Sequence, residues 1–165
     1  MLLATSYDGT LGVYDLRKSP KSAERLYALS DCLEEDLLAL QVVKGGRFVV
    51  TASNQGTLFI FKWDFFGDCS DLMRLSGQQS ASIDSLLKVD EDTLLAGGED
   101  GYLRAISLYP NRVHSILGKH SEDEEHFPIF KIARSRCGNY VASTSNDSSI
   151  KFYEITDLLR DRAAY

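Results

Sequence analysis

The sequence contains few of the residues that indicate a disulfide-rich or membrane-spanning protein. Its 165 residues include only three cysteines, three prolines and one tryptophan. Cys32, Cys69 and Cys137 are odd in number and widely spaced, which argues against a disulfide framework and favours a reducing compartment. There is neither an apolar run long enough to span a bilayer nor a signal-type amino terminus. We expect one soluble, intracellular domain.

Positive charge is also scarce, because the formal net charge is −6. A surface of this balance has no general affinity for phosphate backbones, which argues against nonspecific nucleic-acid binding by the whole surface. Hydrophobic residues make up 44% of the chain, which is enough to build a core.

What the sequence does contain is one pattern that occurs four times: an apolar, β-branched run, a polar turn and a second apolar run. The turn positions are spaced by 47, 45 and 47 residues, which matches a four-stranded propeller blade and not the helical repeats of about 33 residues. These turn positions are Gly9, Gly56, Gly101 and Ser148. The residues directly before them are Asp8, Gln55, Asp100 and Asp147, and the residues two places earlier still are Ser6, Ser53, Gly98 and Ser145.

Each unit is expected to supply strands a, b, c and d, with the repeated turn between b and c. For the second copy we predict strand d of the preceding blade at 26–29, then a at 37–43, b at 48–53 and c at 57–61. The a–b hairpin contains Gly45 and Gly46, and paired glycines supply the positive φ that such turns require.

The strand count predicts an all-β fold of about three and a half blades, and propellers close with about four to eight. We therefore expect part of a longer ring, with seven blades the expected number. Closure as four blades and the pairing of two half rings are the alternatives. The predicted blade units are 1–29, 30–82, 83–118 and 119–155, followed by a tail at 156–165 that suits a short helix.

The residues of the first copy resemble a WD40 repeat, with Asp8, Gly9, Tyr14 and Asp15 at consensus positions. The dipeptide Trp63-Asp64 is two residues out of register and is expected to begin a longer loop. The resemblance implies a buried relay of turn Asp, strand Ser, loop His and Trp, which stabilises a blade only when it is complete. Three members of this relay occur together in only one of the copies, where Tyr153 replaces the Trp. That structural relay is His120, Ser145 and Asp147.

Two loops that a blade does not itself require, 66–71 and 109–113, resemble the family of WD repeat-containing protein 55. This resemblance implies a nuclear, largely nucleolar and also cytoplasmic scaffold that supports ribosomal RNA processing and ribosome biogenesis through pre-ribosomal proteins. It also implies an alternative, a substrate receptor that docks on the adaptor of a cullin-4 ubiquitin ligase. The early blades and the Lys/Arg-rich tail of that family are not in this sequence.

Charges sort by loop class, because d–a and b–c loops share one face of a propeller and a–b and c–d loops share the other. Either the two faces steer partners of opposite charge, or the loops collect charge for solubility. An RNA-binding rim is a second alternative, on the basic face. The acidic face has Asp31, Glu34, Glu35, Asp36, Glu99, Glu122, Asp123, Glu124 and Glu125; the basic face has Arg17, Lys18, Lys21, Lys44, Arg47, Arg112, Arg134 and Arg136.

Arg17 is the sharpest candidate for partner binding. The segment Tyr14-Asp15-Leu16-Arg17 resembles the Trp-Asp-x-Arg signature of adaptor docking, although an ordinary exposed arginine is the alternative. The residue that precedes the Asp or Gln of each turn projects from a b–c loop and is a further candidate for partner binding. Among these residues, the aromatic one is the best anchor. These are Tyr7, Asn54, Glu99 and Asn146.

Nothing in the sequence predicts catalysis, a metal or a cofactor. Asp84, Asp90 and Asp92 lack the spacing of a calcium loop. His114, His120 and His126 lack the spacing of a zinc site. We expect a protein that is not an enzyme, that binds proteins and that has no small-molecule substrate and no membrane partner.

Overall fold

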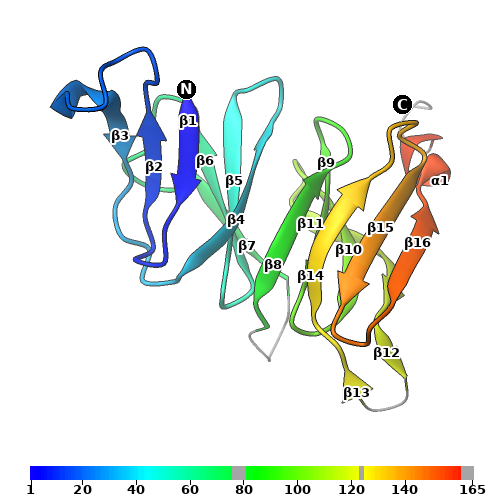
Figure 1. Ribbon diagram of the computed structural model, residues 1–165. Helices are drawn as coiled ribbons and strands as arrows, with labels where there is room; N and C mark the ends of the chain where they lie inside the picture. The colour runs from blue at the N-terminus through cyan, green and yellow to red at the C-terminus, as the bar shows by residue number, and fades with distance from the viewer. Residues whose placement is uncertain (76–80, 123–124, 161–165) are drawn as a thin grey trace. The chain divides into compact units, whose positions relative to one another are not determined.

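The structure is a computed structural model that describes residues 1–75, 81–122 and 125–160 (Figure 1). The chain divides into two compact units, Met1–Ser80 and Ala81–Tyr165, and each is described by itself. Both units consist of antiparallel sheets of three or four strands, so the prediction of an all-β, partial propeller fold is confirmed.

The first unit contains two sheets, which we call blades 1 and 2. A 3-10 helix, η1 (Ala23–Arg25), lies in the loop between the second and third strands. Blade 1 consists of β1 (Leu2–Thr5), β2 (Leu11–Tyr14) and β3 (Leu26–Leu29), and blade 2 of β4 (Leu37–Val43), β5 (Phe48–Ser53), β6 (Thr57–Lys62) and β7 (Asp71–Arg74).

The second unit contains blades 3 and 4, a short hairpin and a helix. Blade 3 consists of β8 (Ile83–Lys88), β9 (Thr93–Gly98), β10 (Tyr102–Ser107) and β11 (Arg112–Lys119), and blade 4 of β14 (Ile129–Arg134), β15 (Tyr140–Ser145) and β16 (Ile150–Glu154). The hairpin is β12 (Ser121–Glu122) with β13 (Glu125–His126), and the helix is α1 (Thr156–Arg160). Helix α1 lies where the sequence suggested a short helix.

The strands predicted for the second copy are confirmed. β3, β4 and β5 have the predicted bounds, and β6 extends one residue further, to Lys62. The central strands β5, β6 and β9 are buried along nearly their whole length, and the turn residues fix the register. Gly45 and Gly46 have φ of +65° and +85°, as the hairpin prediction required.

The four turn positions share a backbone conformation that ordinary residues avoid. Gly9, Gly56 and Gly101 have φ of +78°, +76° and +71°. Ser148 has φ of +59°, although a side chain disfavours this region. The four copies therefore make the same turn, which supports their assignment as one repeat.

Each unit buries a core between its two blades. In the first unit, Leu11 and Val13 of β2 pack in one cluster with Leu37 of β4 and Phe61 of β6. Burial of one such leucine contributes about 2 kcal/mol. In the second unit, the corresponding strand β10 supplies Leu103 and Ala105, which form a cluster with Ile129 and Ile132 of β14. The same two positions of strand c thus receive the next blade in both units.

Two local features lie outside the strands of the four blades. The flanks of the acidic run after His120 form the hairpin β12–β13, which extends past β14 in Figure 1. Asp123 and Glu124 lie outside the described residues, as do residues 161–165 of the predicted tail. Trp63 follows β6 and packs edge-on against the buried Phe66, with ring centroids 5.4 Å apart, so it begins a loop as predicted.

Candidate functional site

The repeated b–c turns are built around a carboxylate that binds the backbone two residues further on. Asp8, Asp100 and Asp147 each accept a hydrogen bond from a backbone N–H, at 3.1, 3.2 and 2.9 Å. An Asp in this position satisfies the N–H that the turn leaves free. Gln55 has no carboxylate, and in its copy the Oγ of Ser53 accepts a hydrogen bond from the N–H of Thr57 at 3.1 Å instead.

The d–a loops lie against these turns within each unit. Leu33 donates its N–H to the carbonyl of Gly9 at 3.1 Å, and His120 donates its N–H to the carbonyl of Gly101 at 2.8 Å. The b–c turns and the d–a loops therefore share one end of the sheets in both units, as the sequence analysis assumed. Gly9 is tightly enclosed, because a Cβ there would lie 3.0 Å from the carbonyl oxygen of Glu35.

His120 lies at the centre of a buried hydrogen-bond network in blade 4. Its side chain is fully buried, its Nδ1 lies 2.8 Å from Asp147 Oδ2, and its Nε2 lies 2.7 Å from Ser143 Oγ. An ionised Asp147 accepts from Nδ1–H, so in the neutral ring Nε2 accepts the hydroxyl proton of Ser143. Ser149 also donates its hydroxyl to Asp147, at 2.8 Å.

Two predicted members of this relay are corrected. The hydroxyl partner of His120 is Ser143 and not Ser145, whose Oγ is buried without a hydrogen-bond partner in the described structure. Both serines are on the same face of β15, and His120 reaches the one farther from the turn. The hydroxyl of Tyr153 is likewise buried without a partner there, so it does not replace the indole donor.

The network holds Asp147 in its ionised form. Partial burial opposes ionisation, but the hydrogen bonds from His120 and Ser149 outweigh it and lower the pKa of Asp147 to about 2. The pair is thus a structural tie between the d–a loop and the b–c turn. Ser143 is fully buried, so its hydroxyl is not exposed to a substrate as a nucleophile would be.

Blade 2 makes the same tie with a glutamate, which the sequence analysis did not foresee. Glu35 of the d–a loop accepts hydrogen bonds from Ser53 Oγ at 2.6 Å and from Thr57 Oγ1 at 3.3 Å. Ser53 and Thr57 are repeat equivalents of Ser145 and Ser149. Glu35 was counted as a free charge of the acidic face, but it is half-buried and stabilises the loop. Its place shortly before strand a was the only available signal.

The predicted anchor residues on the b–c loops differ in their exposure and in their hydrogen bonds to the rest of the fold. Tyr7 is 76% exposed, and Asn146 is exposed. Asn54 is half-buried, because its Oδ1 accepts a hydrogen bond from the N–H of Asp36 at 3.1 Å. Glu99 is exposed but accepts from the N–H of Ser82 at 3.3 Å. Tyr7 and Asn146 are therefore less committed to the fold than Asn54 and Glu99.

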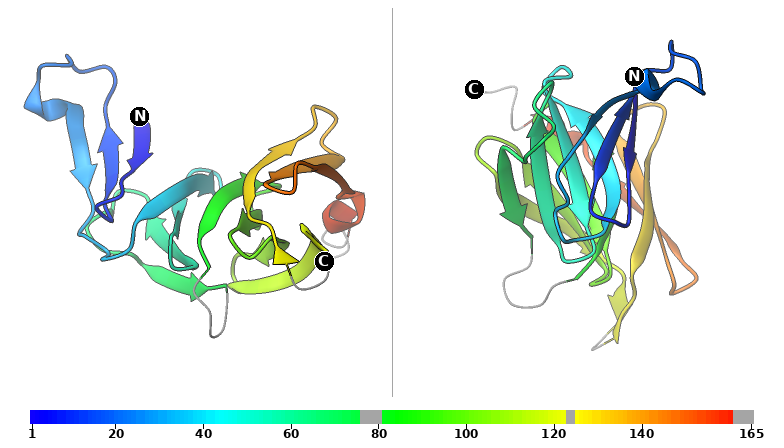
Figure 2. Two further views of the ribbon diagram at one scale, coloured as in Figure 1. Left: turned by 60° about the horizontal axis from the view of Figure 1, so that its bottom comes forward. Right: turned by 90° about the vertical axis from the view of Figure 1, so that its left-hand side faces the viewer.

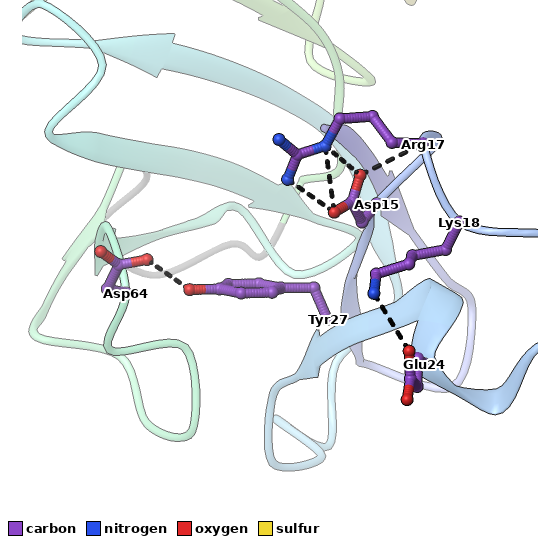
Figure 3. A network of polar contacts seen from close by, with 6 residues as sticks. All are labelled: Asp15, Arg17, Lys18, Glu24, Tyr27 and Asp64. Carbon is purple, nitrogen blue, oxygen red and sulfur yellow. Dashed lines mark hydrogen bonds and ion pairs between the residues drawn. The ribbon is translucent and has the colours of Figure 1, made fainter.

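Arg17 follows β2 and is held by the preceding carboxylate (Figure 3). Its Nε lies 2.9 Å from Asp15 Oδ1, and its Nη2 lies 2.7 Å from Asp15 Oδ2, a bidentate pair. The hydrogen bonds from Arg17 hold the pKa of Asp15 far below its usual range. The Asp15 side chain is 9% exposed, whereas that of Arg17 is 84% exposed.

This geometry presents one edge of the guanidinium to solvent. Nη1 has no hydrogen-bond partner among the residues that the structure describes. Because Asp15 fixes the plane of the guanidinium, the free edge has a defined direction, which lowers the entropy lost when it binds a carboxylate, phosphate or carbonyl. Arg17 is thus a pre-oriented donor at the end of the sheet that has the a–b and c–d loops.

Neighbouring residues of the same surface are paired with one another. Lys18 Nζ lies 3.1 Å from Glu24 Oε2, and Tyr27 donates its hydroxyl to Asp64 Oδ1 at 2.9 Å, which joins blade 1 to the loop after β6 (Figure 3). The hydrogen bond to Asp64 raises the pKa of Tyr27. The first contact lies within the loop between β2 and β3, and the second joins β3 to the loop after β6.

Another cation of the predicted basic face serves the fold. Arg134 donates from Nη1 to the carbonyl of Val89 at 2.7 Å and from Nε to the carbonyl of Gly138 at 2.9 Å. It therefore joins the a–b turns of blades 3 and 4. A guanidinium committed to two carbonyls has fewer donors left for a phosphate backbone, so the basic face is weaker than a count of its charges indicates.

The part of the chain that the structure describes contains no group of three or more His, Cys, Asp or Glu side chains placed to hold a metal ion. In the same residues, no helix has the length and apolar character needed to cross a membrane. The side chain of Arg17 is 84% exposed and Tyr7 is 76% exposed, so both are accessible to a partner.

Comparison with known protein families identifies one of the repeats. The family model described as "WD domain, G-beta repeat" matches residues 117–154, which include the relay of His120 and Asp147. The chain thus contains a WD40 repeat. The four turns with positive φ are what the repeats have in common, whereas the His120 relay belongs to this one repeat.

Similarity to full-length relatives covers nearly all of this WD40 chain. It is 37% identical to WD repeat-containing protein 55 of Bos taurus over 96% of its length, and 35% identical to that of Arabidopsis thaliana, also over 96%. It is 30% identical over 97% to WD repeat-containing protein JIP5 of Cryptococcus neoformans. The matches cover 38%, 41% and 40% of those proteins, so the chain spans about two fifths of their length.

Proposed function

We propose that this chain is part of a nuclear, largely nucleolar WD40 scaffold that binds pre-ribosomal proteins and supports ribosomal RNA processing. The observation that carries the proposal is similarity to WD repeat-containing protein 55 over 96% of the chain in both an animal and a plant. WD40 domains generally act by binding other proteins. The exposed recognition side chains and the structural use of the buried polar groups support a role without catalysis.

The test is depletion of the gene product together with purification of its tagged form from the source cells. The proposal predicts that unprocessed ribosomal RNA precursors accumulate, that pre-ribosomal proteins co-purify and that the tagged protein lies in the nucleolus. Normal precursor levels after depletion would contradict it. A precursor defect without co-purifying pre-ribosomal proteins would contradict the scaffold role.

A second candidate is a substrate receptor of a cullin-4 ubiquitin ligase, and the orientation of Arg17 favours it. An adaptor that offers a carboxylate or a carbonyl to the free edge of Arg17 gains a charge-assisted hydrogen bond at low entropic cost. The phosphate-binding alternative, an RNA-binding rim, has less support, since Arg134 and Lys18 are already paired.

Three variants separate these functions. Arg17→Ala removes the donor, Arg17→Lys keeps the charge but not the planar fork, and Lys21→Ala removes an exposed charge of the same loop as a matched control. Adaptor docking predicts that co-purification of the adaptor falls in both Arg17 variants and not in the control. An equal loss in Lys21→Ala, with binding to RNA that weakens steeply as salt rises, would instead favour the RNA-binding rim.

A further inference from the structure

The loop between β2 and β3 is a self-contained unit that projects from blade 1. Figure 2 shows it extending beyond the strands that it joins. The N–H of Asp15 donates to the carbonyl of Arg25 at 2.8 Å and so joins the two ends of the loop. Within the loop, the N–H of Ser22 donates to the carbonyl of Ser19 at 3.0 Å. Residues 16 to 21 are all exposed. Such a loop opens locally at little cost, because few contacts outside it have to break.

Ser19 is at the tip of this loop and contributes little to its structure. Among the residues that the structure describes, its Oγ accepts only from the N–H of Lys21, at 3.5 Å, which is at the limit of a hydrogen bond. By contrast, Ser22 is half-buried and its Oγ caps η1 by accepting from the N–H of Glu24 at 3.3 Å. The hydroxyl of Ser19 is therefore exposed and available for modification.

The residue that follows Ser19 adds specificity. The three prolines of the sequence follow Ser19, Tyr109 and Phe127, so Ser19-Pro20 is its only Ser-Pro or Thr-Pro dipeptide. Proline has no N–H and holds the preceding residue in an extended conformation. A kinase pocket that gives no acceptor to the amide after the phosphorylated residue therefore selects proline there, because any other residue leaves an N–H unsatisfied.

We propose that Ser19 is a phosphorylation site for a proline-directed serine/threonine kinase and that its phosphate takes Arg17 away from Asp15. In the transfer, Ser19 Oγ attacks the γ-phosphorus of ATP and forms the new O–P bond. The bond from that phosphorus to the oxygen bridging to the β-phosphate breaks, and ADP leaves. The hydroxyl proton passes to the base of the kinase.

The charges around Ser19 give the phosphate its effect. Phosphoserine has a charge of about −1.5 to −2 at neutral pH and three acceptor oxygens. Three cations, Arg17, Lys18 and Lys21, are within two residues of it in the sequence. The pair of Arg17 with Asp15 is solvent-exposed on the arginine side, and exposed pairs contribute little, so a dianion in the same loop competes for the guanidinium.

The effect of phosphorylation on partner binding rests on the proposed docking role of Arg17. A phosphate on Ser19 occupies the guanidinium that a partner would bind and places negative charge where a carboxylate would approach. Phosphorylation would thus release a partner held through Arg17. The site itself, and the transfer of Arg17 from Asp15, do not depend on that role and are tested without any partner.

The first test treats the purified protein with a cyclin-dependent kinase and ATP and maps phosphate by mass spectrometry. We expect one phosphate, on Ser19. Pro20→Ala should lower the rate of incorporation by about tenfold or more, because it removes the selected residue. Ser22→Ala is the matched control and should incorporate phosphate at the rate of the wild type. Phosphate on other residues only, or an equal rate in Pro20→Ala, would overturn the site.

The second test follows the carboxyl of Asp15 by NMR during a pH titration. In the unmodified protein, Arg17 keeps the pKa of Asp15 well below its usual range. Phosphorylation of Ser19 should raise that pKa toward the ordinary value, and the Arg17→Ala variant should do the same. A phosphorylated protein with an unchanged Asp15 titration would overturn the transfer of Arg17. Neither result bears on ribosomal RNA processing, so the proposed function fails or stands separately.

Discussion

Blades 2 and 4 tie the d–a loop to the b–c turn by different chemistry. Blade 4 uses a fully buried histidine between Asp147 and Ser143, whereas blade 2 uses the half-buried Glu35 between Ser53 and Thr57. Both blades nevertheless make the turn at the same position, with φ of +76° at Gly56 and +59° at Ser148. The comparison indicates that the backbone turn defines the repeat and that the side-chain network can vary.

The largest expected effect comes from making blade 3 more like the other copies. Gly98 is the repeat equivalent of Ser53 and Ser145, but a Cβ there would lie 1.7 Å from the carbonyl oxygen of Ser82. Gly98→Ser should therefore lower the free energy of unfolding by about 3 kcal/mol or more, because the backbone has to move. Urea unfolding measures this, with Gly67→Ser, at an open position, as the control.

The next effect compares the two networks directly. His120→Ala leaves Asp147 without its buried partner and should cost about 3 kcal/mol, whereas Glu35→Ala should cost about 1 kcal/mol, since Glu35 is half-buried and His120 is fully buried. Thermal and urea unfolding of the two variants give both values. Equal losses would show that the networks contribute alike despite their difference in burial.

The pH dependence of stability should report on the Asp147 network of blade 4. Because the folded pKa of Asp147 is about 2, below the usual value near 4, its ionised form stabilises the fold above about pH 4 and that contribution is lost as pH falls toward 2. Melting temperatures of the wild type and Asp147→Asn should converge over that interval. A constant difference between them down to pH 2 would contradict a depressed pKa.

The smallest effect, and a stabilising one, is expected at Ser148. Ser148→Gly places at this turn the residue that the other three copies have, and it relieves the left-handed conformation of a residue with a side chain. We expect a gain of about 0.5 to 1 kcal/mol, because the added flexibility of the unfolded chain offsets part of the relief. Gly56→Ser, the reverse exchange, should be destabilising in the same assay.

The strands and turns were predictable because they depend on local patterns. Alternating apolar residues and the spacing of the turns placed β3, β4 and β5 with their observed bounds. The networks were less predictable, because the side chains that meet come from loops of variable length. Residues 143 and 145 are on one face of β15, and sequence spacing alone does not say which of them His120 reaches.

The candidate recognition residues illustrate the same limit. Arg17 was predicted from its position after strand c, but its bidentate pair with Asp15 depends on side-chain geometry that spacing does not specify. Arg134 and Glu35 were counted as surface charges, and each is instead bound to a neighbouring loop. Charge counts by loop therefore overstate how many side chains are free to bind a partner.

The backbone conformation at Ser148 tests the account most directly, because the assignment of four equivalent WD40 turns depends on it. NMR chemical shifts and scalar couplings of the purified protein measure φ at this residue. The account predicts a positive φ near that of Gly9, Gly56 and Gly101. A negative φ at Ser148, with the other three positive, would contradict the equivalence of the fourth copy.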